Sequence, residues 1–402
     1  MKAVVFTLGC KVNEVESASL MASLEKAGWE VDDKLSYAEA YILNTCAVTR
    51  EAEKKSRQLI ARVKKFNPEA KIFVCGCASE KDKASFLRRG AAYVTGARDK
   101  SGVLRAFERE FGLQKQPPAY PKQTKTRAFI KIQDGCNNFC SYCVIPYLRG
   151  REVSRPIEDI VAEINATESP EIVLTGINIS SYEGGLASLI RALEDVKKRI
   201  RLGSLECGVI DDELLSALDG LYDFAPQFHL SLQSGSDAVL KAMNRHYTRA
   251  EYIRKCESIY KRFPAAAITT DIIAGFATET ESDFLDSLSI IEEVGFARVH
   301  AFAFSPREGT VAYKMKDVPP QIKSERLHRL LEAAEKCAAG YASGFIGREA
   351  EIIAEVREDG YTCGYTGNYI RAYVPSELEA GRKYKVTIKK LYKDGVVAEV
   401  NG

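Results

Sequence analysis

The chain has 402 residues, of which 46% are hydrophobic and 28% are charged, and its formal net charge is +2. This length predicts two or three globular domains, each large enough for its own core. No run of about 18 or more apolar residues occurs, so the sequence excludes a membrane-spanning helix. The low net charge excludes a global electrostatic field for nucleic acid, so such a partner would need local basic patches.

The cysteine content bears on the cellular compartment. The run from Met1 to Phe6 begins directly as a strand and lacks the pattern of a signal peptide, so we expect a cytoplasmic protein without a membrane association. Thiols stay reduced there, so the 11 cysteines are expected to bind metal or to pack rather than to form disulfides.

Residues 1–113 alternate between strand and helix patterns. An apolar run at 3–8 is followed by a helical pattern at 14–27, and short strands at 41–43 and 71–74 enclose an amphipathic helical pattern at 51–66. This alternation predicts an α/β fold with a doubly wound parallel sheet and helices on both faces.

Three cysteines of this segment occupy equivalent positions. Cys10, Cys46 and Cys77 each follow the carboxyl end of a different predicted strand. In open α/β sheets these ends meet at the crevice where ligands bind, so the pattern predicts that the three thiolates share one metal centre. The alternative is that each cysteine is a small buried packing residue.

Residues 114–126 are rich in proline and polar residues, which predicts a linker between domains. The segment 127–338 then shows about six strand–helix units, which predict a partial (βα)6 barrel with its chemistry at the carboxyl ends of the strands. Its strand candidates are residues 128–132, 171–174, 202–205, 228–232, 268–273 and 299–304. Polar or glycine-containing segments follow several of them and are candidates for cofactor contacts.

The most specific motif is the loop Cys136-Asn137-Asn138-Phe139-Cys140-Ser141-Tyr142-Cys143, directly after the first of these strands. Three thiolates at this spacing can bind one metal centre, but a closed zinc site or a fully protein-ligated iron–sulfur cluster takes four ligands. A 4Fe–4S cubane held by three thiolates leaves one iron open for a substrate or cofactor. The alternative is a zinc site completed by a distant His or Cys.

Two basic regions are candidates for nucleic-acid contact. Arg149, Arg151 and Arg155 follow the cysteine loop, a composition that suits phosphate contact and base stacking or simply a solvated loop. Residues 347–400 show five short β-type segments, as in a small all-β barrel. Lys389 and Lys390 lie there among tyrosines, which favours an RNA-binding surface, although lysines also occur on exposed strand faces.

The whole chain resembles the methylthiotransferase family of radical S-adenosylmethionine (SAM) enzymes. Besides the cysteine loop, the matching segments are Thr7-Leu8-Gly9-Cys10-Lys11-Val12-Asn13, Asn44-Thr45-Cys46, Gly76-Cys77, Ser231-Leu232-Gln233-Ser234-Gly235 and Met243-Asn244-Arg245. The resemblance implies a methylthiotransferase domain at 1–113, a linker at 114–126, a radical SAM domain at 127–338 and a TRAM domain at 339–402.

The resemblance also implies two 4Fe–4S clusters and SAM as cofactors. Cys136, Cys140 and Cys143 would hold the catalytic cluster, whose open iron binds SAM and whose electron cleaves it to a 5′-deoxyadenosyl radical. Cys10, Cys46 and Cys77 would hold an auxiliary cluster that presents sulfur to the substrate carbon. Contacts to SAM are expected at Tyr142, Thr175, Gly176, Gln233 and Ser234. Packing roles are expected for Cys75, Cys207, Cys256, Cys337 and Cys363.

The implied activity is methylthiolation of tRNA, with the anticodon stem-loop as RNA partner at Arg149, Arg151, Arg155, Lys389 and Lys390. The Gly9-Cys10-Lys11-Val12-Asn13 form of the first motif resembles the branch that acts on C2 of N6-threonylcarbamoyladenosine beside the anticodon. Alternatives are isopentenyladenosine in tRNA, an aspartate of a ribosomal protein, a radical SAM enzyme with one cluster, and a non-enzymatic iron–sulfur or zinc RNA-binding protein. We expect a monomer that receives electrons from a donor such as flavodoxin or ferredoxin.

Two segments depart from the family pattern. Ala277 and Thr278 stand where the family usually has Pro and Gly, which changes the chemistry of a turn expected beside SAM. Val153 stands where a further Arg is common, which weakens the basic character of the loop that follows the cysteines.

Overall fold

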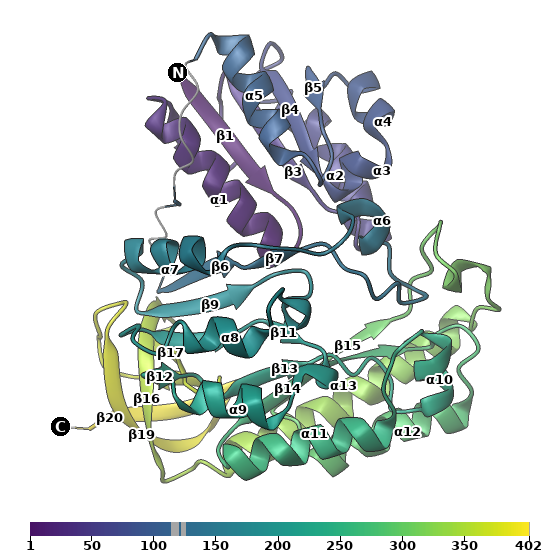
Figure 1. Cartoon of the computed structure of the whole chain (residues 1–402), viewed down its shortest axis with the longest axis vertical. Coiled ribbons are helices and arrows are strands. Elements are labelled where there is room, and N and C mark those ends of the chain that lie inside the picture. Colours follow the sequence, from purple (N-terminus) through teal and green to yellow (C-terminus); the bar gives the residue numbers. More distant parts are fainter. Residues whose placement is uncertain (114–119, 122–125, 402) are drawn as a thin grey trace. The chain divides into compact units, whose positions relative to one another are not determined.

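The computed structural model describes residues 1–113, 120–121 and 126–401. The chain divides into two compact units (Figure 1). Unit 1 comprises residues 1–123, 134–139 and 143–152, and unit 2 comprises residues 124–133, 140–142 and 153–402. Most of the predicted linker 114–126 lies outside the described residues, so the domain boundaries expected from the sequence stay a prediction.

Unit 1 is built on a five-stranded parallel sheet in the order β2-β1-β3-β4-β5. Its strands are β1 (Lys2–Thr7), β2 (Glu30–Asp32), β3 (Ala40–Thr45), β4 (Lys71–Gly76) and β5 (Tyr93–Val94). Every residue of the central strand β3 is buried, as expected for a parallel strand covered on both faces. This strand order is a common doubly wound arrangement, which confirms the predicted fold class.

Helices cover both faces of this sheet (Figure 1). Leu24 of α1 and Phe107 of α5 belong to the hydrophobic core on one face, and Ile60 of α2 and Phe86 of α4 belong to the core on the other. The helices of unit 1 are α1 (Lys11–Lys26), α2 (Arg50–Val63), α3 (Cys77–Lys81), α4 (Lys83–Arg88), α5 (Lys100–Phe111) and α6 (Ile145–Arg149).

Unit 2 contains two four-stranded parallel sheets, in the orders β12-β10-β9-β6 and β11-β13-β14-β15. The strands are β6 (Arg127–Lys131), β9 (Glu171–Thr175), β10 (Arg199–Leu202), β11 (Ser204–Leu205), β12 (Asp223–Phe224), β13 (Gln227–Leu230), β14 (Ala267–Ala274) and β15 (Arg298–Ala303). Only Gly203 separates β10 from β11, and its N–H donates to the carbonyl of Leu174 at 2.8 Å. Each of the six predicted strands therefore coincides with an observed strand or with the β10–β11 pair.

One large hydrophobic core joins these sheets to the helices of unit 2 except α10, whose Val239 belongs to a smaller core. The helices are α7 (Ile157–Ala166), α8 (Leu186–Arg191), α9 (Asp212–Asp219), α10 (Asp237–Ala242), α11 (Arg249–Arg262), α12 (Glu281–Val294) and α13 (Pro320–Ser343). Capping boxes at Thr248 and Thr280 fix the starts of α11 and α12. A short ladder of β7 (Gln133–Asp134) and β8 (Val153–Ser154) lies on either side of the cysteine loop in sequence.

The C-terminal segment forms a closed barrel in the order β16-β17-β18-β20-β19, as predicted. Its strands are β16 (Glu349–Glu358), β17 (Tyr361–Thr366), β18 (Arg371–Val374), β19 (Lys383–Tyr392) and β20 (Gly395–Val400). Ile352, Val386, Ile388, Val396 and Ala398 are fully buried in its interior. The pairs are antiparallel except β18–β20, which is parallel.

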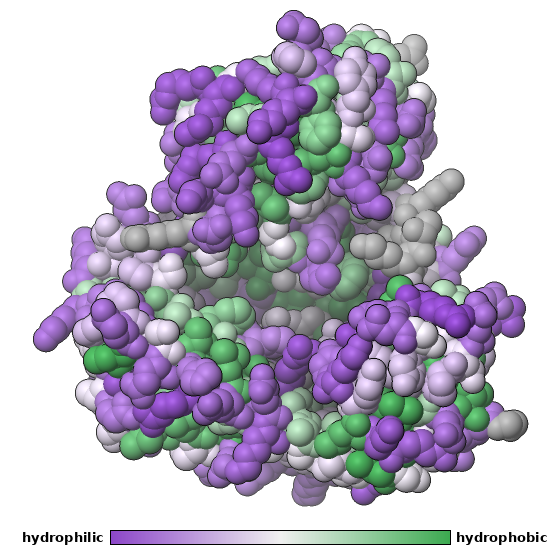
Figure 2. Space-filling model, turned by 180° about the vertical axis from the view of Figure 1, so that it is seen from behind, coloured by the Kyte–Doolittle hydropathy of each residue, from purple (hydrophilic) through white to green (hydrophobic). Residues whose placement is uncertain are grey.

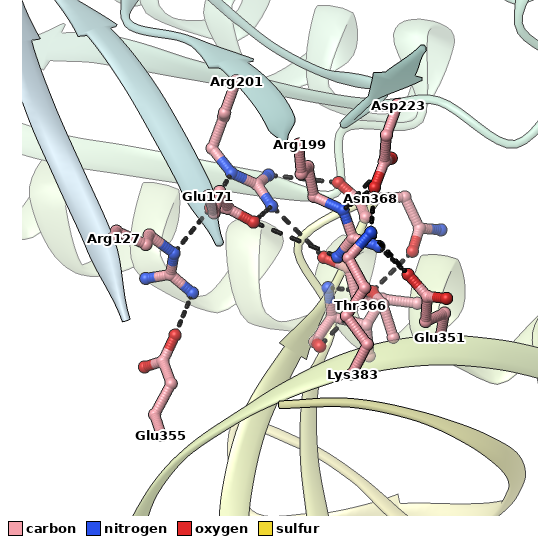
Figure 3. Close-up of polar contacts among 12 residues, drawn as sticks. Arg127, Glu171, Arg199, Arg201, Asp223, Glu351, Glu355, Thr366, Asn368 and Lys383 are labelled. Carbon is pink, nitrogen blue, oxygen red and sulfur yellow. Dashed lines mark hydrogen bonds and ion pairs between the residues drawn. The ribbon is translucent and has the colours of Figure 1, made fainter. Parts of the chain in front are cut away.

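A buried ion network attaches this barrel to the parallel sheet of β6, β9 and β10 (Figure 3). At its centre Glu171, 1% exposed, accepts hydrogen bonds from Arg127 at 2.7 Å and from Arg201 at 2.8 Å and 3.1 Å. The barrel supplies Glu351 and Glu355 as partners of further arginines. The remaining contacts join Arg199 to Asp223, Lys383 to Asp223, and Arg201 to the carbonyls of Thr366 and Gly367.

No described helix has both the length and the apolar character that crossing a membrane requires. Hydrophilic side chains cover most of the face drawn in Figure 2, with hydrophobic side chains scattered among them.

Candidate metal centres and substrate surfaces

The cysteine loop presents three sulfur atoms that each receive a hydrogen bond from an N–H group. The donors are the backbone of Asn138 to Cys136 at 3.5 Å, the backbone of Ile145 to Cys143 at 3.5 Å, and the guanidinium of Arg245 to Cys140 at 3.3 Å. Such donors favour the thiolate form, which is the form that binds a metal centre. The donor set of the loop therefore fits an iron–sulfur cluster.

Backbone geometry holds the loop in shape. Gly135 has φ 73°, and a Cβ there would lie 2.0 Å from the carbonyl oxygen of Arg151, so another residue would require the chain to move. Phe139 also adopts a positive φ of 47°, and its ring lies edge-on to Tyr147 and beneath the guanidinium of Arg151. The position of Cys136 and the residues after it is thus set by close packing.

Arg245 is a residue of this region to which the sequence assigned no role. Its side chain is 4% exposed, pairs with Glu206 and donates to the carbonyl of Ser231 at 3.2 Å. Its Nε donates to the hydroxyl of Tyr247 at 3.1 Å, and its Nη1 donates to Cys140. The position of Arg245 inside a family-like segment was its only sequence signal, because the contact joins residues 105 positions apart.

A second group of cysteines lies at the carboxyl ends of the strands of unit 1. Cys10 is the N-cap of α1, Cys46 follows β3, and Cys77 follows β4. Burial raises the pKa of the Cys77 thiol to about 11, and Arg149 opposes this rise by its charge and a hydrogen bond. Cys10 and Cys46 both raise the pKa of Cys77 further, so the three sulfurs lie close enough to act on one another electrostatically.

Close backbone contacts bring these three loops together. Gly76 has φ 106°, and a Cβ there would lie 2.3 Å from the carbonyl oxygen of Thr45, directly before Cys46. A Cβ on Gly9 would lie 3.1 Å from the Cβ of Cys46. The glycine that precedes each of two cysteines therefore permits the approach of the chains that carry them.

Cys75 differs from its neighbour Cys77 in its surroundings. Cys75 is fully buried in the core that contains α1 and α5, and burial raises its pKa to about 12. Cys77 belongs to the core of the opposite face, at the end where Cys10 and Cys46 lie. These surroundings are consistent with the expectation that Cys77 is a ligand and Cys75 a packing residue.

Arg149 does not lie at the surface that the sequence predicted for it. Its side chain is 1% exposed and donates to Asp134 at 3.0 Å, to Asn13 at 2.6 Å and to Glu16 at 3.1 Å. Its charge also acts on Cys77. This burial leaves no accessible guanidinium for a phosphate, so the expected RNA contact is replaced by a contact to the second cysteine group.

The other expected RNA contacts differ in accessibility. Arg151, Lys389 and Lys390 are exposed. Arg155 is partly exposed, but its guanidinium binds Glu163 at 2.6 Å and the carbonyl of Lys131 at 2.8 Å, which is a structural role. Lys389 pairs with Glu399 at 3.1 Å.

Four of the five expected SAM contacts lie at the carboxyl ends of two strands. The fifth, Tyr142 in the cysteine loop, has its ring edge-on to that of Phe276. Thr175 ends β9 and Gly176 follows it, and a Cβ on Gly176 would meet the carbonyl of Gln133 at 2.9 Å. Gln233 has φ 72° and pairs through its backbone with β14. The hydroxyl of Ser234 is fully buried against that of Ser287 of α12, so its side chain is unavailable to a cofactor in this conformation.

The turn that departs from the family pattern keeps an unusual backbone conformation. Thr278 has φ 71°, although a β-branched residue rarely adopts the left-handed region. The following residue, Glu279, closes the turn by accepting the N–H of Gly275 at 2.9 Å and a hydrogen bond from Arg326 at 2.8 Å. The glycine usual at position 278 would therefore suit this backbone better than the threonine found here.

We expect Thr278→Gly to stabilise the protein by about 1 kcal/mol, because it relieves a left-handed β-branched residue and loses part of that gain to the entropy of glycine. The measurement is the urea midpoint of unfolding at unchanged slope. Asn244, at φ 59°, supplies the control, since asparagine tolerates this region and Asn244→Gly should gain clearly less. If Thr278→Gly destabilises the protein, the backbone at Thr278 is not strained.

Among the described residues, no three His, Cys, Asp or Glu side chains are close enough together to bind a single metal ion. A cubane places several iron and sulfide atoms between its protein ligands, so its thiolates lie farther apart than those around one ion.

Comparisons with known proteins agree with this geometry. Residues 2–96 match the uncharacterized protein family UPF0004, and residues 130–291 match the radical SAM superfamily. The solved structure of the radical S-adenosylmethionine methyltransferase TsrM from Kitasatospora setae shares the fold with a TM-score of 0.57 at 12% identity, over 75% of this chain and 74% of that one. The chain is an enzyme of the radical SAM superfamily.

The similarity to curated relatives is more specific. The threonylcarbamoyladenosine tRNA methylthiotransferase MtaB of Chlamydia pneumoniae is 37% identical over 98% of this chain and 96% of its own length. The tRNA-2-methylthio-N(6)-dimethylallyladenosine synthase of Thermotoga petrophila is 33% identical over 97% and 95%. The chain belongs to the radical SAM tRNA methylthiotransferase family, which implies SAM and a 4Fe–4S cluster as cofactors.

Proposed function

We propose that this enzyme adds a methylthio group to C2 of N6-threonylcarbamoyladenosine in tRNA, with SAM and two 4Fe–4S clusters as cofactors. The observation that carries the second cluster is the electrostatic contact among Cys10, Cys46 and Cys77 beside Arg149. The choice of nucleoside is supported by the name and the 37% identity of the relative from Chlamydia pneumoniae.

The residues of the chain have separate tasks in this proposal. Cys136, Cys140 and Cys143 hold the catalytic cluster, and Cys10, Cys46 and Cys77 hold the auxiliary cluster. When bound, these clusters and SAM supply the radical chemistry and the sulfur atom. Arg245 and Arg149 each place a buried positive charge beside one cysteine group, which offsets the charge of the thiolates.

Exposed cations would hold the RNA while the modified base leaves its stack. Phosphate contacts hold the RNA in position without reading the base, so a flipped base and the phosphates need separate partners. We assign this task to Arg151 and to Lys389 and Lys390 of β19, which are exposed. An enzyme that modifies a protein would not need these cations. Substitutions at them therefore also test whether the substrate is tRNA or a protein.

Lys390→Ala is expected to weaken tRNA binding a few-fold for all tRNA sequences and to reduce the slope of log K against log salt by about one unit, because it removes one phosphate contact. Binding isotherms at several salt concentrations measure this slope. Lys336→Ala on α13 is the control, since Lys336 is also exposed and pairs only loosely with Glu292 at 3.7 Å. If the salt dependence of binding is unchanged in Lys390→Ala, Lys390 of β19 does not contact an RNA phosphate.

The test of the proposed function is mass spectrometry of nucleosides from tRNA of cells that lack this protein. Loss of 2-methylthio-threonylcarbamoyladenosine, with accumulation of its unthiolated precursor, is the expected result. Loss of the isopentenyl counterpart instead would show that the enzyme has the substrate named for the 33% identical relative. Unchanged tRNA would indicate a protein substrate and overturn the proposal.

A further inference from the structure

One face of the sheet β11-β13-β14-β15 carries polar side chains where a barrel usually has apolar ones. In register, His229 of β13 pairs with Thr269 of β14, which pairs with Arg298 of β15, and Asp271 of β14 pairs with His300 of β15. The alternate residues of these strands belong to the core beneath the helices, for example Phe228, Ile268 and Val299. The five polar residues therefore share the inner face, which we call the inner polar face.

A chain of hydrogen bonds orders most of this face. Gln227 donates from its side-chain nitrogen to the hydroxyl of Thr269 at 3.0 Å, which leaves that hydroxyl to donate to Nδ1 of His229 at 3.0 Å. Nε2 of His229 then carries its proton and donates to the carboxylate of Asp271 at 3.2 Å. The chain ends on Asp271, whose side chain is 29% exposed, so this carboxylate can accept a hydrogen bond from a ligand.

His300 lies opposite Asp271 and takes no part in this chain. Its ring centroid lies 5.8 Å from that of His229, and the side chain is exposed. Among the residues that the structure describes, no hydrogen-bond partner satisfies either nitrogen of the His300 ring. Asp271 and, with the opposite sign, His229 and Arg298 act electrostatically on His300, so a carboxylate and a fixed positive charge both lie close to this ring.

The inner polar face is also accessible. β15 is the edge strand of its sheet, and Phe302, two residues beyond His300 on the same side of the strand, is 53% exposed. Closed parallel barrels fill the inner face with packed branched side chains, and this face does not. A ligand that fits it needs a negative group for Arg298 and His300 and a hydrogen-bond donor for Asp271.

The two tRNA nucleosides differ in this respect. A threonylcarbamoyl group carries a free carboxylate, a hydroxyl and amide-type N–H groups, whereas an isopentenyl group offers only hydrocarbon. An apolar substituent placed against Asp271, His229 and His300 would leave their polar atoms unpaired at a cost in affinity. The chemistry of the face therefore matches the polar substituent.

We propose that the inner polar face is the subsite that recognises the threonylcarbamoyl group, with His300 and Arg298 binding its carboxylate and Asp271 accepting a hydrogen bond from its hydroxyl or N–H. This inference rests on the proposed function, because it names the residues that select its substrate. His229 acts as a positioning residue, which orients Asp271.

The test compares the binding of the loaded enzyme to three anticodon stem-loop RNAs that carry threonylcarbamoyladenosine, isopentenyladenosine or unmodified adenosine. The wild-type enzyme should bind the first about tenfold or more tightly than the third, as expected for a hydrogen bond to a charged group. His300→Phe should remove this preference without changing the affinity for the unmodified RNA, and His300→Gln, which keeps a donor, should retain part of it.

His328→Phe is the matched control, because His328 is 75% exposed on α13 and lies outside the inner polar face. Iron and sulfide analysis of each variant measures cofactor loading, and the rate of SAM cleavage without RNA should be unchanged in the control His328→Phe. An unchanged preference in His300→Phe overturns the subsite while methylthiolation of the threonylcarbamoyl RNA continues to support the proposed function. A wild-type enzyme that modifies only the isopentenyl RNA overturns both.

Discussion

Replacing Cys77 by alanine is expected to abolish methylthiolation of tRNA while reductive cleavage of SAM continues. Cys77 shares an electrostatic environment with Cys10, Cys46 and Arg149, and removing one of three thiolates leaves a cluster without a full set of protein ligands. The residues of the cysteine loop remain in place in this variant. The product would therefore be lost at the sulfur-transfer stage, which liquid chromatography of nucleosides and of 5′-deoxyadenosine can distinguish.

Iron and sulfide analysis of the reconstituted protein gives a second measurement for the same variant. Two cubanes predict about eight iron atoms per wild-type chain and about four in Cys77→Ala. Cys75→Ala is the matched control, because Cys75 is fully buried in the core of the opposite sheet face and should cost only about 1 kcal/mol of stability. About four iron atoms in the wild-type protein would establish the one-cluster alternative.

Glu171→Gln is the substitution with the largest expected effect on stability, a loss of about 3–5 kcal/mol. The change keeps the shape of the side chain but removes the charge that Arg127 and Arg201 share at hydrogen-bonding distance. These arginines would stay buried with fewer counter-charges. Adding Arg201→Met to Glu171→Gln should recover part of the loss, because it removes one uncompensated cation. The free energy of urea-induced unfolding measures both variants.

The exposed pair of Glu292 and Lys336 supplies the control for this prediction. Their side chains are 77% and 83% exposed, so Glu292→Gln should change the stability by less than about 0.5 kcal/mol. An equal effect of the two substitutions would show that burial does not decide the cost.

The pH dependence of the Glu171 contribution has a defined sign. Burial alone would raise the pKa of Glu171, but the charges of Arg201, Arg127 and Arg199 lower it below the usual range. A carboxyl with a lowered pKa in the folded state contributes stability above its unfolded pKa and loses that contribution as the pH falls through the folded value. The difference in stability between wild type and Glu171→Gln should therefore shrink below about pH 4.

Local sequence patterns were sufficient to predict the fold. The apolar run of β9, which is buried throughout, and the turn residues between the C-terminal strands are properties of neighbouring residues. The same holds for the cysteines, because each is placed by a strand end or by a short loop. The strand order of the C-terminal barrel, with its parallel β18–β20 pair, depends on distant pairing and was not predictable in this way.

Side-chain direction limited the prediction of the site. Arg149 was assigned to RNA from its basic neighbours, but Asn13 and Glu16, more than one hundred positions away, draw its guanidinium inward. Ser234 was assigned to SAM, but Ser287 binds its hydroxyl. The contact of His300 with His229 and Asp271 arises from strand register, which no local motif records.

The ion network beneath β6, β9 and β10 makes the last 60 or so residues hard to transplant. Glu351 and Glu355 neutralise Arg199 and Arg127 of the preceding segment, and the carbonyls of Thr366 and Gly367 satisfy Arg201. A chain that ended at Ser343 would leave these arginines without their counter-charges. A C-terminal barrel taken from a relative would need carboxylates at the matching positions. The C-terminal barrel and the arginines of β6 and β10 that it neutralises can therefore be exchanged between proteins only together.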